Sequence, residues 1–136
     1  MNAPIPVKDA LKLLSMAIED CDKATPGPWL PDEIGFDEGV PNITDHEGGK
    51  LFDVRGWGML ASRFGRESEE ALAIHRANMR FPVLARATMR PMLEVVKQAI
   101  APLNPTWVVG ETGDAYPPLA ALMAHYDATR PDWRTR

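Results

Sequence analysis

The chain has 136 residues, of which 45% are hydrophobic and 25% charged, and its net charge is −4. These values fit one globular domain and exclude a disordered chain, a collagen and a coiled-coil rod. No apolar run is long enough to predict a transmembrane span. The N-terminus lacks a basic segment, and the single cysteine, Cys21, fits a reducing compartment. We therefore expect a single domain over residues 1–136 that is cytoplasmic and has no membrane partner.

Charge is distributed unevenly along the chain. Residues 1–49 contain three lysines and ten acids, a net charge of −7, whereas residues 50–97 contain nine bases and five acids, a net charge of +4. The acidic total argues against duplex nucleic acid as a partner. The basic middle predicts an anion-facing surface, because guanidinium groups suit phosphate and carboxylate. Pairing with the acidic first third, or a solvated helix face, is the alternative. Eight of the central bases are Arg55, Arg63, Arg66, Arg76, Arg80, Arg86, Arg90 and Lys97.

An amphipathic helix is predicted from Val7 to Ala24. Its apolar positions recur every three or four residues and include Cys21, which we interpret as a small buried hydrophobe. The helix must end before Thr25, because Pro26 and Pro28 cannot continue it. The apolar face consists of Val7, Leu11, Leu14, Ile18 and Cys21.

Short strands are predicted between Trp29 and Phe64. The clearest feature is a hairpin, in which Ile43 precedes a turn at Asp45–Gly49 and Leu51–Val54 follows it. The two glycines of this turn can adopt positive φ without steric cost. Met59–Phe64 is expected to add another strand. These segments predict a small antiparallel sheet.

A long helix is predicted from Ser68, a capping residue, to about Ile100. Proline interrupts the pattern at Pro82 and Pro91, and we expect a kink or a short break at Pro91. A helical seam nevertheless continues across that proline. The seam consists of Phe81, Leu84, Thr88, Met92, Val95 and Ala99.

The C-terminal third is predicted as an extension of this core. Thr106–Val109 is expected to form a short strand or an extended arm, and a helix is expected from Pro118 to Thr129. The last residues are expected to be a loose end, from which Trp133 could contact a partner. The predicted fold class is α+β: three to four antiparallel strands flanked by an N-terminal helix and a long kinked helix, with a C-terminal helix.

The sequence contains no recognised catalytic signature: there is no glycine-rich phosphate loop, no nucleophile elbow and no HExxH helix. His46 lies between Asp45 and Glu47, so a small hydrolase or transferase that uses these groups is the alternative function. We expect His75 and His125 to be structural or solvated. No cofactor and no metal site are predicted.

One segment favours a ligand site. Trp57 lies between two glycines and follows Arg55, so its indole could stack on a base while the guanidinium contacts a phosphate. Packing of Trp57 into the core is the alternative. Arg76 and Arg80 lie one helical turn apart, and Asn78 between them could read a base edge or cap a helix. The predicted ligand site is Arg55, Trp57, Arg76, Asn78 and Arg80.

The segment Lys23–Trp29, KATPGPW, resembles the ATPGPW signature of small phage early proteins of the Ead type. That family places a helix before the signature, then an antiparallel sheet with a D-x-x-G hairpin, then a further helix. Here Asp45–Gly48 matches the hairpin, while Asn78–Arg86 and Met89–Leu93 match the helical part. Pro82 departs from the isoleucine of the family pattern. The resemblance covers residues 7–100 and leaves residues 101–136 as an extension.

The signature also has a physical interpretation. Pro26 stops the helix, Gly27 permits a reversal, Pro28 fixes φ, and Trp29 fills the junction between helix and sheet. The resemblance implies a phage accessory protein that acts on the host, often by blocking a defence system. We therefore expect a non-catalytic, homo-oligomeric binding protein that captures a host protein or a small anionic, nucleotide-like molecule. Four tryptophans and a long helix suit the interface of such an oligomer.

Overall fold

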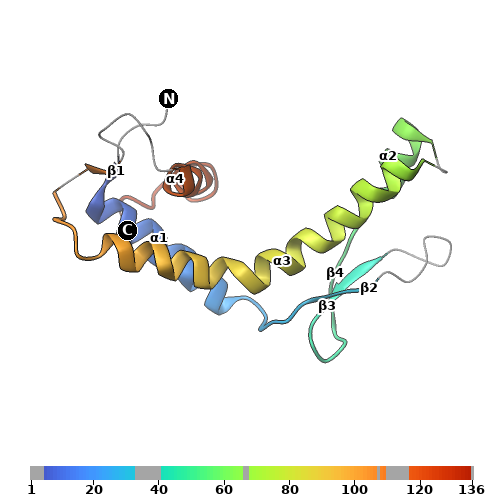
Figure 1. Ribbon diagram of the computed structural model, residues 1–136, viewed down its shortest axis with the longest axis horizontal. Helices are drawn as coiled ribbons and strands as arrows, with labels where there is room; N and C mark the ends of the chain where they lie inside the picture. Colours follow the sequence, from blue (N-terminus) through green and yellow to red (C-terminus); the bar gives the residue numbers. More distant parts are fainter. Residues whose placement is uncertain (1–4, 33–40, 66–67, 107, 110–116, 136) are drawn as a thin grey trace. The chain divides into compact units, whose positions relative to one another are not determined.

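The residues that the structure describes form an α+β fold with four helices and a three-stranded antiparallel sheet, 62% helical and 11% strand, which confirms the predicted fold class. A computed structural model describes residues 5–32, 41–65, 68–106, 108–109 and 117–135 (Figure 1). None of the helices in this part of the chain has the length and apolar character needed to cross a membrane.

The chain divides into two compact units, and the single domain predicted over residues 1–136 stays a prediction. We call Met1–Lys23 with Arg90–Arg136 the terminal unit, and Ala24–Met89 the central unit. Both ends of the chain therefore contribute to one unit, and the ATPGPW segment and the three-stranded sheet belong to the other.

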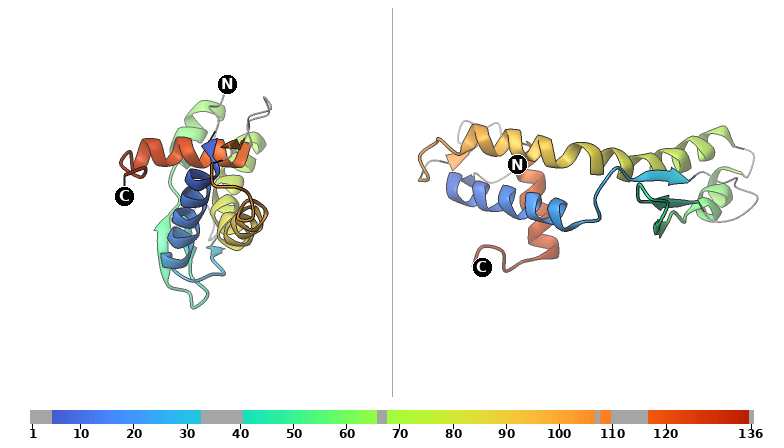
Figure 2. Two further views of the ribbon diagram at one scale, coloured as in Figure 1. Left: turned by 90° about the vertical axis from the view of Figure 1, so that its left-hand side faces the viewer. Right: turned by 90° about the horizontal axis from the view of Figure 1, so that it is seen from below.

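In the terminal unit, α1 (Val7–Lys23) begins where the sequence predicted and ends one residue before the predicted Ala24. Asp9 lies in its first turn and Lys23 in its last, where each charge complements the helix dipole. α1 packs beside the last turns of α3, and α4 (Pro117–Thr129) lies across α1 (Figure 2).

A two-stranded antiparallel ladder closes the terminal unit. β1 (Ile5–Pro6) pairs with β5 (Val108–Val109), so that Ile5 lies opposite Val109 and Pro6 opposite Val108. Of the two alternatives predicted for Thr106–Val109, the strand is correct for Val108–Val109. Through this ladder the chain after α3 returns to the start of α1.

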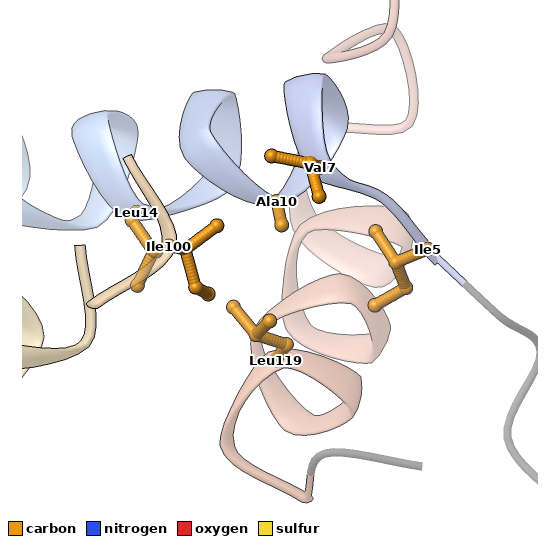
Figure 3. Packing of buried hydrophobic residues seen from close by; sticks show 6 residues of the cluster. All are labelled: Ile5, Val7, Ala10, Leu14, Ile100 and Leu119. Carbon is orange, nitrogen blue, oxygen red and sulfur yellow. The ribbon is translucent and has the colours of Figure 1, made fainter. Parts of the chain in front are cut away.

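The main core of the terminal unit brings together three distant parts of the chain. The residues at its centre are almost fully buried, and each isoleucine, leucine or valine among them stabilises the fold by about 1.5–3 kcal/mol relative to exposure. Figure 3 shows Ile100 from the end of α3 and Leu119 from α4 facing the apolar side of α1. The cluster is Ile5, Val7, Ala10, Leu14, Ile100 and Leu119.

A second cluster contains the C-terminal segment. Trp133 is fully buried against Leu13, Ala17 and Tyr126. The expectation of a loose end is therefore wrong for residues 131–135, and Trp133 docks onto its own chain. The residues after α4 are too few to show a periodic pattern, so their packing could not be predicted from the sequence.

In the central unit the sheet has the order β2 (Leu30–Asp32), β3 (Asn42–Thr44) and β4 (Lys50–Asp53), with antiparallel pairing throughout. The β3–β4 hairpin is the one predicted from the glycine pair. Its centre is Ile43, which is fully buried with Val54 and with Met79 from α3.

The segment Met59–Phe64 is helical, which corrects the predicted strand. It belongs to α2 (Trp57–Phe64), which begins where Leu60 N–H donates to Gly56 C=O at 3.1 Å and ends at Gly65. Leu60 and Ala61 are both buried. Two adjacent buried positions fit one side of a helix, whereas strand neighbours point to opposite faces.

α3 (Glu69–Ile100) is one continuous helix of 32 residues. Ser68 caps it, since its Oγ accepts a hydrogen bond from Ala71 N–H at 3.3 Å. The helix continues through Pro82 and Pro91 without the break that the sequence suggested. Proline has no backbone N–H, so Pro91 removes one helical hydrogen bond. The free energy gained by apolar packing on both sides of Pro91 exceeds this cost, because Met79 and Ile100 are buried in the cores of their respective units.

Candidate functional site

Arg55, one of the predicted ligand residues, lies immediately before α2. Its side chain is 76% exposed. Gly56 follows with φ 125° and has no side chain that could cap the helix. The first turn of α2, Trp57-Gly58-Met59, contains no acid. A guanidinium therefore precedes a helix N-terminus whose first N–H groups have no intrahelical acceptors.

Arg55 shares one carboxylate with a second base. Asp53 accepts from Lys50 Nζ at 2.8 Å and from Arg55 Nη2 at 3.4 Å. The hydrogen bond from Lys50, with a further contribution from Arg55, lowers the pKa of Asp53. Ion pairs this exposed are weak, so an incoming anion could compete with Asp53 for both bases.

Trp57, which lies between two glycines in the sequence, is the first residue of α2. Its side chain lies outside the described part of the structure. The predicted stacking role of Trp57 therefore stays a prediction.

Arg76 and Arg80 lie one turn apart on α3, and both are exposed. Asn78 is also exposed, but two residues turn a helix by about 200°, so helical geometry directs Asn78 away from the Arg76–Arg80 row. Asn78 lies in the helix interior, which excludes the capping role that was its alternative.

Other central bases contact groups of their own chain. Arg90 Nε donates to Asp22 Oδ1 at 2.6 Å, and Arg90 also lies 3.7 Å from Glu94. The hydrogen bond and charge of Asp22 raise the pKa of Arg90. Arg86 lies over the Trp29 ring at 5.9 Å. Arg86 and Arg90 therefore fit the alternative explanation, in which the bases make contacts within the chain.

The ATPGPW segment is held by its tryptophan. Trp29 Nε1 donates to Thr25 C=O at 2.9 Å, and the ring meets Phe52 edge-on at 5.9 Å. Trp29 also packs against the Ile43 cluster, although it is half-buried and not the fully buried anchor expected. Gly27 lies close to Arg86, since a Cβ at Gly27 would lie 3.3 Å from Arg86 Cγ.

Asp45 performs a structural role in the hairpin turn. Its Oδ1 accepts from the N–H groups of Glu47 and Gly49, at 2.9 and 2.8 Å. His46 is exposed, with Nε2 3.7 Å from Glu47 Oε1. Asp45 Oδ1 thus closes the turn, and no observation favours a catalytic role for Asp45, His46 and Glu47.

The structure separates the remaining histidines and the cysteine. His75 is fully buried in α3, and this burial lowers its pKa. His125 is exposed on α4, and Cys21 is half-buried. Within the described residues, no group of three His, Cys, Asp or Glu side chains could hold a metal ion.

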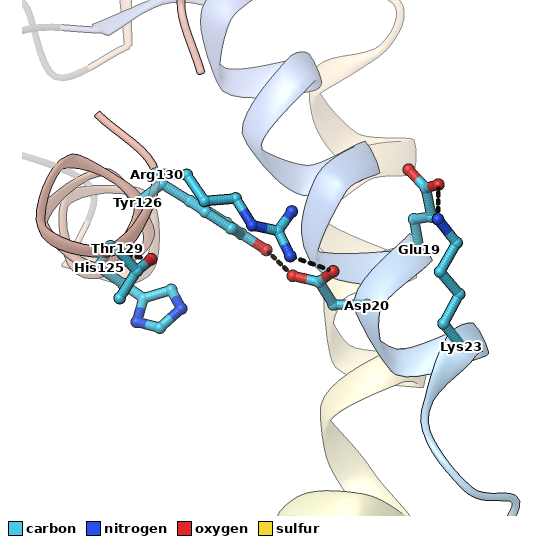
Figure 4. Close-up of polar contacts among 7 residues, drawn as sticks. All are labelled: Glu19, Asp20, Lys23, His125, Tyr126, Thr129 and Arg130. Atoms are coloured by element: carbon cyan, nitrogen blue, oxygen red, sulfur yellow. Dashed lines mark hydrogen bonds and ion pairs between the residues drawn. The ribbon is translucent and has the colours of Figure 1, made fainter. Parts of the chain in front are cut away.

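A polar cluster joins α1 to α4 (Figure 4). Asp20 accepts hydrogen bonds from the Tyr126 hydroxyl and from Arg130, each at 2.8 Å. Burial by itself raises the pKa of Asp20, but these two donors lower it to below the ordinary value. Both carboxylate oxygens are used, so the cluster stabilises the fold of the terminal unit.

The exposed side of α3 contains large apolar residues of the predicted helical seam, for which the sequence suggested no function. Four of its large side chains are more than half exposed: Phe81 (68%), Leu84 (59%), Met92 (65%) and Val95 (66%). The predicted helical seam contains all four, so its periodicity was correct. The sequence could not tell that a different side of α3 supplies the buried residues Ala71, Met79 and Ile100.

Comparisons with protein-family models, with curated proteins and with solved structures each found nothing that matches this chain.

Proposed function

We propose that this chain is a non-catalytic phage accessory protein that captures a small anionic, nucleotide-like molecule of the host, in a stoichiometric complex that counteracts host defence. The observation that supports the proposal is the exposed Arg55 directly before the uncapped N-terminus of α2. The phage context comes from the ATPGPW resemblance alone.

Physical chemistry favours an anion at this place. The N-terminus of a helix carries a partial positive charge, and its first N–H groups point outward as donors. Arg55 adds a planar guanidinium that can bind phosphate through two parallel hydrogen bonds. Lys50 adds a second positive charge through its contact with Asp53. Capture without turnover fits the lack of a recognised catalytic motif in the sequence.

The proposal is tested by calorimetry against nucleoside mono-, di- and triphosphates and cyclic mono- and dinucleotides. We expect one of these to bind, and Arg55→Glu to weaken it by about tenfold or more. The matched control is Arg63→Glu, the same charge change at the other end of α2. Asp53→Asn should tighten binding, because it removes the carboxylate that competes for Arg55 and Lys50.

Heat from none of these nucleotides would contradict the proposal, and so would equal effects of Arg55→Glu and Arg63→Glu. The roles of Arg76, Asn78 and Arg80 are tested in the same titration. If Arg76→Ala and Arg80→Ala leave the affinity unchanged, the site is confined to Arg55 and the start of α2.

A host protein is the second candidate ligand, and exposed apolar residues of the central unit favour it. Met59 on α2 is 61% exposed, and three other large apolar side chains of this unit are also exposed. Such residues are typical of protein interfaces where they form a patch. The test is affinity capture from infected cells with wild type and with Met59→Glu. A partner retained by wild type and lost by the variant supports this candidate. The other three are Leu30, Phe52 and Phe64.

A further inference from the structure

The part of α3 that belongs to the central unit, Glu69–Met89, exposes two neighbouring rows of side chains. Residues four apart follow one another along the surface of a helix, where they form ridges that pack against the ridges of other helices. One row has two arginines and a leucine, and the other has two alanines and a phenylalanine. All six residues are exposed, and we call them the α3 ridge pair: Arg76, Arg80 and Leu84 in one row, and Ala73, Ala77 and Phe81 in the other.

The α3 ridge pair faces away from the core of the central unit. Ala71, His75 and Met79 form the buried side of the same part of the helix. At about 100° per residue, the middle of the ridge pair lies about 170° around the helix from His75. Phe81 and Leu84 are 68% and 59% exposed, so the core of this unit does not account for these two large apolar side chains. Exposed apolar residues that lie together are typical of an interaction surface.

Positive charge is concentrated in this part of α3. Between Ala71 and Met89 the sequence has three arginines and no acid, whereas the whole central unit has seven bases and ten acids, a net charge of −3. A flat anionic membrane or a long duplex would approach the acids of the unit as well as its arginines. A narrow partner would contact the ridge pair alone, because charges more than about 8 Å away are largely screened at physiological salt. The charge pattern therefore favours a narrow acidic partner.

We infer that the α3 ridge pair binds an acidic amphipathic helix of a partner protein. One ridge of that helix fits between the two rows, where the two alanines allow close approach. Its carboxylates accept charge-assisted hydrogen bonds from Arg76 and Arg80, and its apolar side chains cover Phe81 and Leu84. A phosphate group would bind the arginines but would leave both apolar side chains in water. This inference goes beyond the proposed anion site, which lies before α2, and does not depend on it.

Selection from a display library of helical peptides tests the inference before the partner is identified. Each peptide has about 20 residues, enough for a helix to form, and its surface positions vary among Glu, Lys, Gln and Leu. We expect the wild-type chain to enrich peptides with Glu along one row and Leu along the next. The double variant Arg76→Glu, Arg80→Glu should enrich Lys in place of Glu. Arg63→Glu, the same charge change on α2, is the matched control and should enrich the same peptides as wild type. Enrichment of no peptide by wild type, or of the same acidic peptides by the double variant, would overturn the inference.

One enriched acidic peptide then measures what the apolar residues contribute. We expect Phe81→Ala and Leu84→Ala each to weaken its binding by about tenfold, as measured by calorimetry. Asn78→Ala changes an exposed residue on another side of α3 and should bind the peptide like wild type. All three residues are exposed, so the variants should have the circular dichroism spectrum of wild type. Wild-type affinity in both Phe81→Ala and Leu84→Ala would show that charge alone attracts the peptide, and it would overturn the inference.

Two further probes distinguish an acidic helix from other anionic partners. The probes are vesicles of equal parts phosphatidylglycerol and phosphatidylcholine, and duplex DNA of mixed sequence. We expect wild type to bind neither probe at physiological salt, under the conditions in which it binds the acidic peptide. Binding of either probe that is lost in the double variant Arg76→Glu, Arg80→Glu would assign the α3 ridge pair to a membrane or to nucleic acid, and it would overturn the inference.

Discussion

The Tyr126 hydroxyl of α4 donates a 2.8 Å hydrogen bond to the Asp20 carboxylate of α1, across 106 residues of sequence. Arg130 donates to the other oxygen of the same carboxylate, and its guanidinium lies over the Tyr126 ring at 5.5 Å. Burial and the contact with Asp20 both raise the pKa of Tyr126, so its hydroxyl keeps the proton that it donates. This arrangement fixes α4 on α1, and with it the segment that follows α4.

Tyr126→Phe is expected to reduce the free energy of unfolding by about 1–2 kcal/mol, because it removes a hydrogen bond to an ionised acceptor and leaves the ring packing intact. Urea denaturation followed by circular dichroism measures the change. His125→Ala, at the exposed neighbouring position, is the control and should remain within about 0.5 kcal/mol of wild type. Equal losses in both variants would show that the hydroxyl has no special role.

Trp133→Ala should destabilise the chain by about 3–5 kcal/mol, the usual cost of truncating a fully buried aromatic residue. It removes a side chain whose Nε1 donates to Asp127 at 2.7 Å and whose ring is covered by Arg134 at 4.3 Å. The matched control is Leu103→Ala, which truncates a partly exposed side chain outside both clusters. A Trp133→Ala protein as stable as wild type would restore the expectation of a loose C-terminal end.

His75 predicts a pH dependence of stability with a definite sign. Burial lowers its pKa in the folded chain, so below about pH 6.5 the unfolded chain binds more protons at this position than the folded chain does. The contribution to stability is therefore complete above that pH and is lost as pH falls towards the folded pKa. We expect the free energy of unfolding of wild type to decrease between about pH 7 and pH 5.

The variant that tests this dependence is His75→Gln, which cannot acquire a proton in that range. Its free energy of unfolding should change less with pH than that of wild type, whatever its absolute stability. His46→Gln alters an exposed histidine and should retain the wild-type slope. If His75→Gln and wild type have the same slope, another group causes the pH dependence.

Local sequence signals predicted the elements that local interactions determine. The apolar period of Val7–Lys23 and the prolines after it were sufficient for α1, and Asp45 with the two glycines was sufficient for the β3–β4 hairpin. The ladder between Ile5 and Val109 joins segments a hundred residues apart, so no local pattern could predict its pairing.

The candidate site was less predictable, because exposure and pairing depend on the whole fold. The sequence does not distinguish Arg90, which binds Asp22, from Arg55, which stays mostly exposed. Helix α2 was not predicted because the two glycines around Trp57 favour a turn. The signal for the helix was the pair of adjacent apolar residues Leu60 and Ala61, since a strand with one buried face would have only one of them apolar.

Gly56 provides the sharpest test of how α2 begins. Its φ of 125° is a conformation that residues with a side chain rarely adopt, although among the described residues no atom beyond its chain neighbours lies within 4 Å of where a Cβ would be placed. Gly56→Ala should therefore cost about 1–3 kcal/mol through backbone strain and not through collision. Gly27→Ala is the complementary control, since Gly27 has no such φ and its added Cβ would meet the flexible side chain of Arg86. Urea denaturation should show a larger loss for Gly56→Ala than for Gly27→Ala, and calorimetry should show weaker anion binding by Gly56→Ala. The reverse order of stability would mean that crowding near Trp29, and not the geometry before α2, limits what this chain tolerates.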